Sequence, residues 1–245
     1  MKIKDKFITF VILTLSVVGI LSFTLNQSNN NRHILSHIVD LKKQTLKFYW
    51  KNDKGENFNN FGGLKNWLKS NKEQLIFATN GGMYNRDQSP QGLYIEQGKT
   101  LAKIDTVENG YGNFYMQPNG IFYITNNNEG VVCKTKDFKN INVKYATQSG
   151  PLLLIDGRIH SKFMEGSKNL NIRNGVGILP NGNLLFAMSK EKINFYDFAT
   201  YFKSQGCKNA LYLDGFVSKT YLPDKNWKSI DGKFGVMIGE TKTIN

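Results

Sequence analysis

Cysteine, histidine and proline are scarce in this sequence, and each shortage excludes a class of protein. Its 245 residues include two cysteines, three histidines and five prolines. Cys133 and Cys207 lie far apart and cannot build a disulfide-rich scaffold, and no CxxC motif or Cys/His cluster offers a zinc site. The two thiols could form one disulfide outside the cell or stay buried and free. The histidines belong to no recognisable catalytic triad, and His160, just after an Asp-Gly turn, is expected to be exposed.

The sequence also lacks a Pro/Ser-rich linker and internal repeats. Hydrophobic residues make up 40% and charged residues 21% of the chain, a globular composition that can fill one large core. We therefore expect a single domain over residues 31–245.

Long apolar runs are absent from that body, but one occurs at the N-terminus. Phe7 to Leu25 carries no charge and follows Lys2, Lys4 and Lys6, the pattern of a secretion signal. The run is also long enough to span a bilayer, and no clear small-x-small cleavage site follows it. We expect residues 1–30 to be an N-terminal membrane anchor, or a cleaved signal peptide, with a polar spacer. The lysines place this end in the cytoplasm and the body outside, in the periplasm or the extracellular space.

Negative charge is in short supply as well. The formal net charge is +13, of which residues 1–30 contribute +2, so the body carries +11. A basic body is common in nucleic-acid-binding proteins, but export and the lack of any RRM, zinc-finger or helix-turn-helix signature argue against that partner. A lysine-rich solvated surface accounts for the charge equally well. The functional interpretation is attraction to phosphorylated glycans or other anionic envelope polymers.

Short apolar runs between turn signals predict strands, and these outnumber the predicted helices. One predicted helix covers residues 62–71. A better specified one begins after Asn194 as N-cap, has Asp197 three residues later, and ends at Gly206, with its apolar side chains on one face. We expect an α+β fold, a single domain with a mixed, mainly antiparallel β-sheet covered by a few helices.

Three predicted strands change from apolar to small and polar residues at their ends. These segments are Thr79-Asn80-Gly81-Gly82, Thr147-Gln148-Ser149-Gly150-Pro151 and Leu213-Asp214-Gly215. Glycine there permits close approach of a ligand, and the amides and hydroxyls suit sugar hydroxyls or phosphate oxygens. Arg173, just before another predicted strand, adds a cation whose fork matches phosphate. If these ends converge, they form a polar site with one carboxylate.

Each of these segments also has a purely structural interpretation. Asn80-Gly81 and Asp214-Gly215 match the sequence signals of hairpin turns. Arg173 alone is typical of a solvated charge, and Ser218 could hydrogen-bond within its own turn. Ser149 lacks the G-x-S-x-G frame of a hydrolase nucleophile. The residues alone therefore predict an exported domain with a polar site and leave its chemistry open.

Four motifs in order closely resemble the phosphodiester glycosidase family, the domain of the enzyme that uncovers mannose 6-phosphate on lysosomal enzymes. The similarity is greatest to the bacterial, envelope-associated branch, and it covers about Ile34 to Gly239. The motifs are FATNGGMYNRDQSPQGLYIEQGK, ATQSGPLLLIDGRIH, RNGVGILPNGNLLFAMS and GCKNALYLDGFVSKTYLP.

The resemblance implies hydrolysis of the bond between a sugar's anomeric carbon and a phosphodiester oxygen. For that reaction our hypothesis is that Asp214 is the base or nucleophile at the anomeric carbon and that Arg173 holds the departing phosphate. The other predicted substrate-binding residues are Asn80, Gly82, Ser149, Gly150, Gly215 and Ser218, which match the family's motifs, and Gly81, Thr147 and Gln148 beside them. Phe216 stands where the family often has a second glycine, so the identity of the substrate stays open.

A site with one carboxylate is compatible with this chemistry. Most glycosidases need two carboxylates because an alkoxide leaves poorly without an acid. A phosphate leaves more easily, so charge stabilisation by Arg173 can replace much of what a general acid does. No dense acidic cluster indicates a metal, so we expect no cofactor and leave assistance by a divalent cation open. The alternative is a non-catalytic module that binds a glycan or envelope polymer.

Overall fold

The structure is a computed structural model that describes residues 33–214 and 217–244. The predicted signal or anchor segment lies outside these residues. Within them, no helix is long and apolar enough to cross a membrane.

The domain consists of three antiparallel sheets, each named here after one strand. The β13 sheet has the strand order β1 (Ile34–Val39), β12 (Leu184–Ser189), β11 (Asn174–Ile178), β13 (Ala210–Asp214), β9 (Leu152–Ile155) and β10 (Arg158–Ile159). The β3 sheet has the order β15 (Trp227–Lys228), β14 (Thr220–Leu222), β3 (Glu73–Asn80), β16 (Met237–Thr243) and β2 (Thr45–Tyr49). The β8 sheet has the order β5 (Lys99–Ala102), β4 (Tyr94–Glu96), β8 (Val143–Ser149), β6 (Gly120–Thr125) and β7 (Gly130–Lys134).

The α+β class and the single domain are confirmed, but the expected mixed sheet is not what forms. All strand pairs among the described residues are antiparallel. The short strands form three separate sheets, and strands that follow one another in the chain often belong to different sheets. For example, β1 pairs with β12 whereas β2 pairs with β16.

The main core lies where the inner faces of the three sheets meet. Phe48 of β2, Phe122 of β6 and Phe186 of β12 come from different sheets. The Phe48 and Phe122 rings are tilted with centroids 5.6 Å apart, and the Phe122 and Phe186 rings meet edge to face at 6.0 Å. Burial of large aromatic side chains is the main stabilising contribution of such a core. It fixes the three sheets relative to one another.

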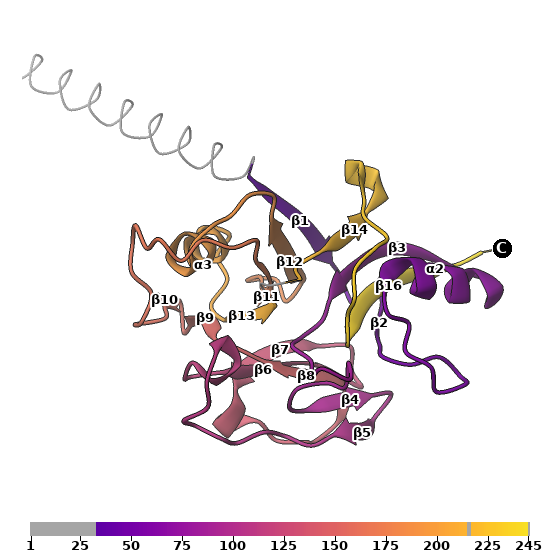
Figure 1. The fold of residues 1–245 in the computed structure, drawn as a ribbon, viewed down its shortest axis with the longest axis horizontal. Helices are drawn as coiled ribbons and strands as arrows, with labels where there is room; N and C mark the ends of the chain where they lie inside the picture. The colour runs from indigo at the N-terminus through magenta and orange to yellow at the C-terminus, as the bar shows by residue number, and fades with distance from the viewer. Residues whose placement is uncertain (1–32, 215–216, 245) are drawn as a thin grey trace, which may run out of the picture.

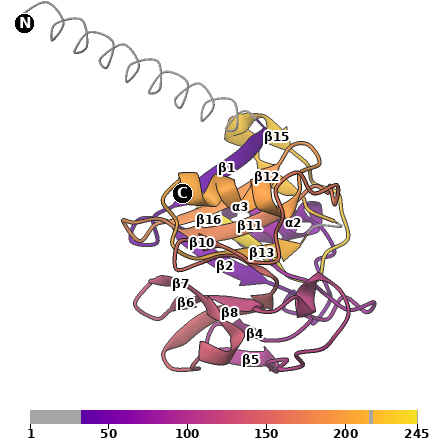
Figure 2. The ribbon, with the colours of Figure 1, turned by 90° about the vertical axis from the view of Figure 1, so that its left-hand side faces the viewer.

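Two helices cover the outer faces, on opposite sides of the molecule (Figure 1). Helix α2 (Phe61–Ser70) packs on the β3 sheet, and helix α3 (Phe195–Ser204) packs on the β13 sheet. As predicted, Asn194 caps α3 by accepting a hydrogen bond from the Asp197 backbone, at 2.8 Å. Figure 2 shows the β8 sheet below the other two. The described residues also form three short 3₁₀ helices: η1 (Asn113–Tyr115), η2 (Thr135–Asp137) and η3 (Pro223–Lys225).

Two local predictions are decided by packing. His160 is buried, not exposed, because its ring stacks on Phe163 and its Nε2 lies 3.1 Å from the carbonyl oxygen of Gln117. Cys133 and Cys207 are free thiols, which settles the alternative between a disulfide and two free cysteines. Burial raises the pKa of Cys133 to about 11 and that of Cys207 to about 12.

Candidate active site

The three polar strand ends lie together, although each belongs to a different sheet. Asn80 ends β3, Ser149 ends β8 and Asp214 ends β13. Each of these three residues is buried. A ligand at this junction would therefore meet groups from all three sheets.

Asn174, the first residue of β11, joins these ends through its side-chain amide. Its Nδ2 donates to the Asn80 carbonyl at 2.8 Å and to the Thr79 hydroxyl at 2.9 Å. Its Oδ1 accepts a hydrogen bond from the backbone N–H of Asp214 at 2.9 Å. Because a buried amide that is bonded at both ends has a fixed orientation, Asn174 sets the position of Asp214 relative to β3.

Ser149 makes the second connection, between the β8 and β13 sheets. Its hydroxyl donates to the carbonyl of Leu213 at 2.7 Å. The register of β11 and β13 shifts at this point, so that Asn174 pairs with Asp214 while Gly175 pairs with Tyr212. Such a bulge redirects the side chains of a strand end. Asp214 thus leaves the regular ladder with its backbone held from both sides.

Glycine allows the loop after β3 to reach β8. A Cβ atom on Gly82 would lie 2.6 Å from the hydroxyl oxygen of Thr147, closer than van der Waals contact permits. Gly81 and Gly150 are packed in the same way, against Ile238 and Asn119. These predicted site residues therefore close the junction between sheets, whatever ligand it holds.

The charge of Asp214 acts on two tyrosines. Burial raises the pKa of Tyr84, and the carboxylate of Asp214 raises it further. Burial also raises the pKa of Tyr212. The positive charge of Arg173 lowers this pKa, and the negative charge of Asp214 raises it further. The Asp214 side chain is itself only 6% exposed. Both phenols are neutral at pH 7, and the Tyr84 hydroxyl donates its proton to the Lys233 carbonyl.

Arg173 is fully buried, contrary to the interpretation as a solvated charge. Its Nε donates to the Ile193 carbonyl at 2.9 Å, one terminal nitrogen donates to the Asn169 carbonyl at 2.8 Å, and the guanidinium stacks 3.5 Å from the centre of the Phe195 ring. The other terminal nitrogen has a long contact of 3.4 Å with the Tyr212 hydroxyl. Burial lowers the pKa of Arg173, but the ordinary value is so high that the group stays charged.

Two predicted substrate contacts are occupied by protein groups. The Gln148 amide accepts from the backbones of Leu93 and Asp105 and donates to Asp105 and Thr135. These four bonds fill its capacity, so it anchors a loop to β8. Ser218 donates to the carbonyl of Asp214 or to Oδ1 of Asn174, as the turn interpretation predicts.

Asn80 provides a buried donor without a protein partner. Its Oδ1 accepts from the backbone of Lys219 at 3.0 Å and from Asn174 at 3.1 Å, which fixes the orientation of the amide. Its Nδ2 is buried and has no hydrogen-bond partner among the described residues. An unsatisfied buried donor costs about 1–3 kcal/mol, and a ligand oxygen would recover that cost.

The hairpin interpretation of Asp214-Gly215 is wrong. The next strand, β14, pairs with β3 and β15 and not with β13, so the chain leaves one sheet and enters another here. Gly215 and Phe216 lie outside the described residues. Sequence reasoning also missed Asn174, Tyr84 and Tyr212 as site residues, although all three are in the motifs on which the resemblance rests.

No group of three or more His, Cys, Asp or Glu side chains able to hold a metal ion occurs in the described part of the chain. The assembled groups are one carboxylate, one buried guanidinium, two phenols and the amides of Asn80 and Asn174. These groups can bind a polar ligand that carries negative charge, and the carboxylate of Asp214 belongs to the same site.

The chain belongs to the phosphodiester glycosidase family, whose model matches residues 73–238. It is similar to the uncharacterized protein YigE of Escherichia coli strain K12. The two are 32% identical over 223 residues, which cover 91% of this chain and 86% of that protein.

Solved structures share the fold at low sequence identity. The catalytic domain of zebrafish N-acetylglucosamine-1-phosphodiester alpha-N-acetylglucosaminidase, auto-inhibited by a pro-peptide, matches with a TM-score of 0.52 and 14% identity, covering 84% of this chain and 87% of that one. A putative exported protein of Burkholderia pseudomallei matches with a TM-score of 0.58 and 9% identity, covering 84% and 73%. A hypothetical protein from Synechocystis matches with a TM-score of 0.51 and 14% identity. The match covers 85% of this chain but only 59% of that longer chain.

Proposed function

We propose that this protein is a hydrolase that cleaves the glycosidic bond of a sugar 1-phosphodiester on an exported, phosphorylated glycan or envelope polymer. The observation that carries the proposal is the placement of Asp214. Asp214 ends β13 and is buried, and its backbone N–H donates to Asn174. Membership of the phosphodiester glycosidase family supports the reaction class.

Asp214 acts at the anomeric carbon in one of two ways. As a base it accepts a proton from water, while the water oxygen bonds to the anomeric carbon. As a nucleophile it first forms a glycosyl ester that water then hydrolyses. In both cases the bond from the anomeric carbon to the phosphate oxygen breaks, and its electron pair leaves with the phosphate.

Arg173 stabilises the negative charge that develops on the departing phosphate. Its charge is poorly screened because it is buried, which strengthens its field at the junction. Tyr212 contacts Arg173, and the Asp214 carboxylate raises its pKa. The free Nδ2 of Asn80 is a donor for a sugar or phosphate oxygen. Arg173 and the neutral donors Tyr212 and Asn80 thus together replace the second carboxylate that most glycosidases use as a general acid.

Export is part of this proposal, and it rests on the sequence of residues 1–30. The apolar run and the lysines before it place the domain in the periplasm or outside the cell, attached through residues 7–25 or released. Phosphorylated envelope polymers are exposed in that compartment, and they would attract the basic body.

The test is release of reducing sugar from an N-acetylglucosamine 1-phosphodiester by the purified full chain. Wild type should release sugar and Asp214→Asn should not, because an amide neither accepts the proton nor attacks carbon. Asp224→Asn, which changes an exposed aspartate in η3, is the matched control and should retain activity. Thermal unfolding of all three proteins checks that the fold is intact. Full activity of Asp214→Asn would refute the assignment.

One observation favours a second candidate, non-catalytic glycan binding. Arg173 has no exposed surface, so phosphate reaches its guanidinium only after a rearrangement. A binding module would show saturable binding of the same phosphodiester without product release, unchanged by Asp214→Asn.

A further inference from the structure

A second polar pocket lies at the far end of β2 from the candidate active site. Its volume is about 260 Å³. It is lined by Leu41, Lys42, Lys43, Gln44, Thr45, Leu46, Ile124, Asn128, Lys144 and Tyr145. Thr45 begins β2, whereas Tyr49 at the other end pairs with Met237, which in turn pairs with Asn80. Four residues of extended chain separate the two ends by roughly 13 Å.

The charged residues that line this pocket are all lysines, although the carboxylates of Asp40 and Glu240 contact Lys43 and Gln44. Of its three lysines, Lys43 has a carboxylate neighbour, Asp40, with 3.5 Å between Nζ and Oδ2. Within residues 33–214 and 217–244, no ion pair neutralises Lys42 or Lys144. Neighbouring ammonium groups without counter-charges repel one another, and a bound anion would relieve that repulsion.

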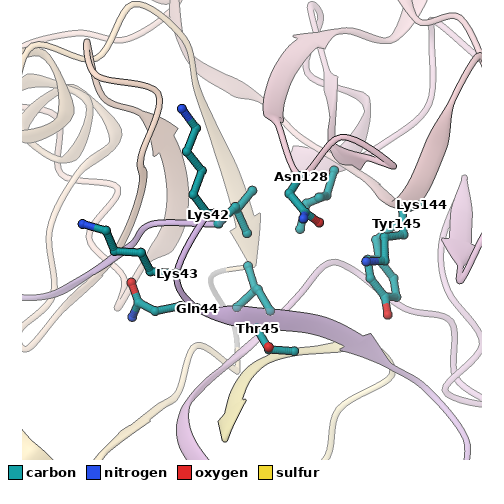
Figure 3. A pocket seen from close by; sticks show the side chains of 10 residues that line it. Lys42, Lys43, Gln44, Thr45, Asn128, Lys144 and Tyr145 are labelled. Carbon is teal, nitrogen blue, oxygen red and sulfur yellow. The ribbon is translucent and has the colours of Figure 1, made fainter.

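The remaining lining provides neutral contacts. In Figure 3, Lys42, Lys43 and Gln44 project from the segment that leads into β2, and Asn128, Lys144 and Tyr145 stand across the hollow from them. The Asn128 amide forms no hydrogen bond with the described part of the chain, and Leu46 and Ile124 are buried against the main core. The volume corresponds to about eight or nine waters, enough for a phosphate with part of a sugar ring.

We propose that this pocket is an accessory site for phosphate groups of the polymer, separate from the candidate active site. The identity of the polymer as a phosphorylated glycan rests on the proposed function, but the phosphate chemistry of the pocket does not. A polymer held here raises the concentration of its own bonds at the strand ends. Loss of the pocket should therefore raise KM for the polymer and leave kcat, and turnover of a small phosphodiester, unchanged.

Direct binding tests the pocket without any turnover. Inorganic tripolyphosphate is titrated calorimetrically into the purified full chain, into Lys42→Gln/Lys144→Gln and into the matched control Lys54→Gln/Lys208→Gln. The control removes two exposed lysines elsewhere on the surface. We expect the first variant to bind about tenfold more weakly and the control to bind like wild type. Asp214→Asn should bind like wild type as well.

Three outcomes would overturn the proposal. Equal weakening by both lysine variants would show that only overall charge matters. Weakening by Asp214→Asn alone would place the phosphate at the strand ends. Tighter binding of an oligothymidylate of matched charge, through the same lysines, would overturn the glycan assignment in favour of a polynucleotide. If tripolyphosphate binds as expected but no phosphodiester is hydrolysed, the proposed reaction fails and the accessory site stands.

Discussion

Removal of the Asn174 side chain should disturb the candidate site more than the rest of the fold. Asn174→Ala leaves the buried backbone N–H of Asp214 without the acceptor that it has at 2.9 Å and removes the link to Asn80. One orphaned buried group costs about 1–3 kcal/mol, and the small cavity adds to it, so we expect a loss of about 3 kcal/mol. For a chain of this size that lowers Tm by roughly 6–12 °C, which leaves a folded protein.

The local effect is read by hydrogen exchange and by turnover. The Asp214 amide hydrogen should exchange much faster in Asn174→Ala, and kcat/KM for the phosphodiester should fall by about 100-fold, the usual result of misplacing a reactive group by an ångström. Leu64→Ala in α2 is the control, since it costs a similar 2–5 kcal/mol far from the strand ends and should preserve both quantities. Slow exchange at Asp214 with unchanged Tm would refute the bridging role of Asn174.

Two further predictions follow from packing. Gly82→Ala places a methyl group 2.6 Å from the Thr147 hydroxyl and should lower Tm by a few degrees. Adding Thr147→Ala to the same chain should restore most of this loss. If the double variant does not regain stability, the contact between residues 82 and 147 is contradicted. Because burial raises the pKa of Cys133 to about 11 and of Cys207 to about 12, both thiols are protonated at pH 8. Iodoacetamide should therefore alkylate the native chain at least about tenfold more slowly than the unfolded chain, with the rate rising above pH 8. Equal rates would show that the half-buried Cys133 and the buried Cys207 do not have raised pKa values.

Local signals in the sequence predict the parts of this fold that depend on local physics. Helix α3 begins at its cap and ends before Gly206, which has a φ of +83°, because capping and periodicity involve neighbours in the chain. The change from apolar to polar residues at Asn80, Ser149 and Asp214 also indicates strand ends correctly. Each signal is complete within about ten residues.

Sequence reasoning is weaker where the structure depends on distant partners. An Asp-Gly pair has the same local preference in a hairpin as in a crossing between sheets, so the pairing of β14 with β3 could not be read from it. Arg173 is a surface-type residue, and only the carbonyls of Asn169 and Ile193 with the ring of Phe195 make its burial tolerable. His160 is buried for the same kind of reason. Asn174 was overlooked because its partners lie 40 and 94 residues away.

The bonds that build the candidate site have a consequence for how the chain folds. Asn80 is joined to Asn174 across 94 residues and to Lys219 across 139, and Ser149 is joined to Leu213 across 64. Contacts between such distant segments form late, because the entropy of closing long loops must be overcome first. The constellation is therefore absent from partly folded chains and from any fragment that lacks one sheet. A chain that crosses a membrane unfolded would carry no assembled site until its C-terminal strand β16 has joined the β3 sheet on the far side.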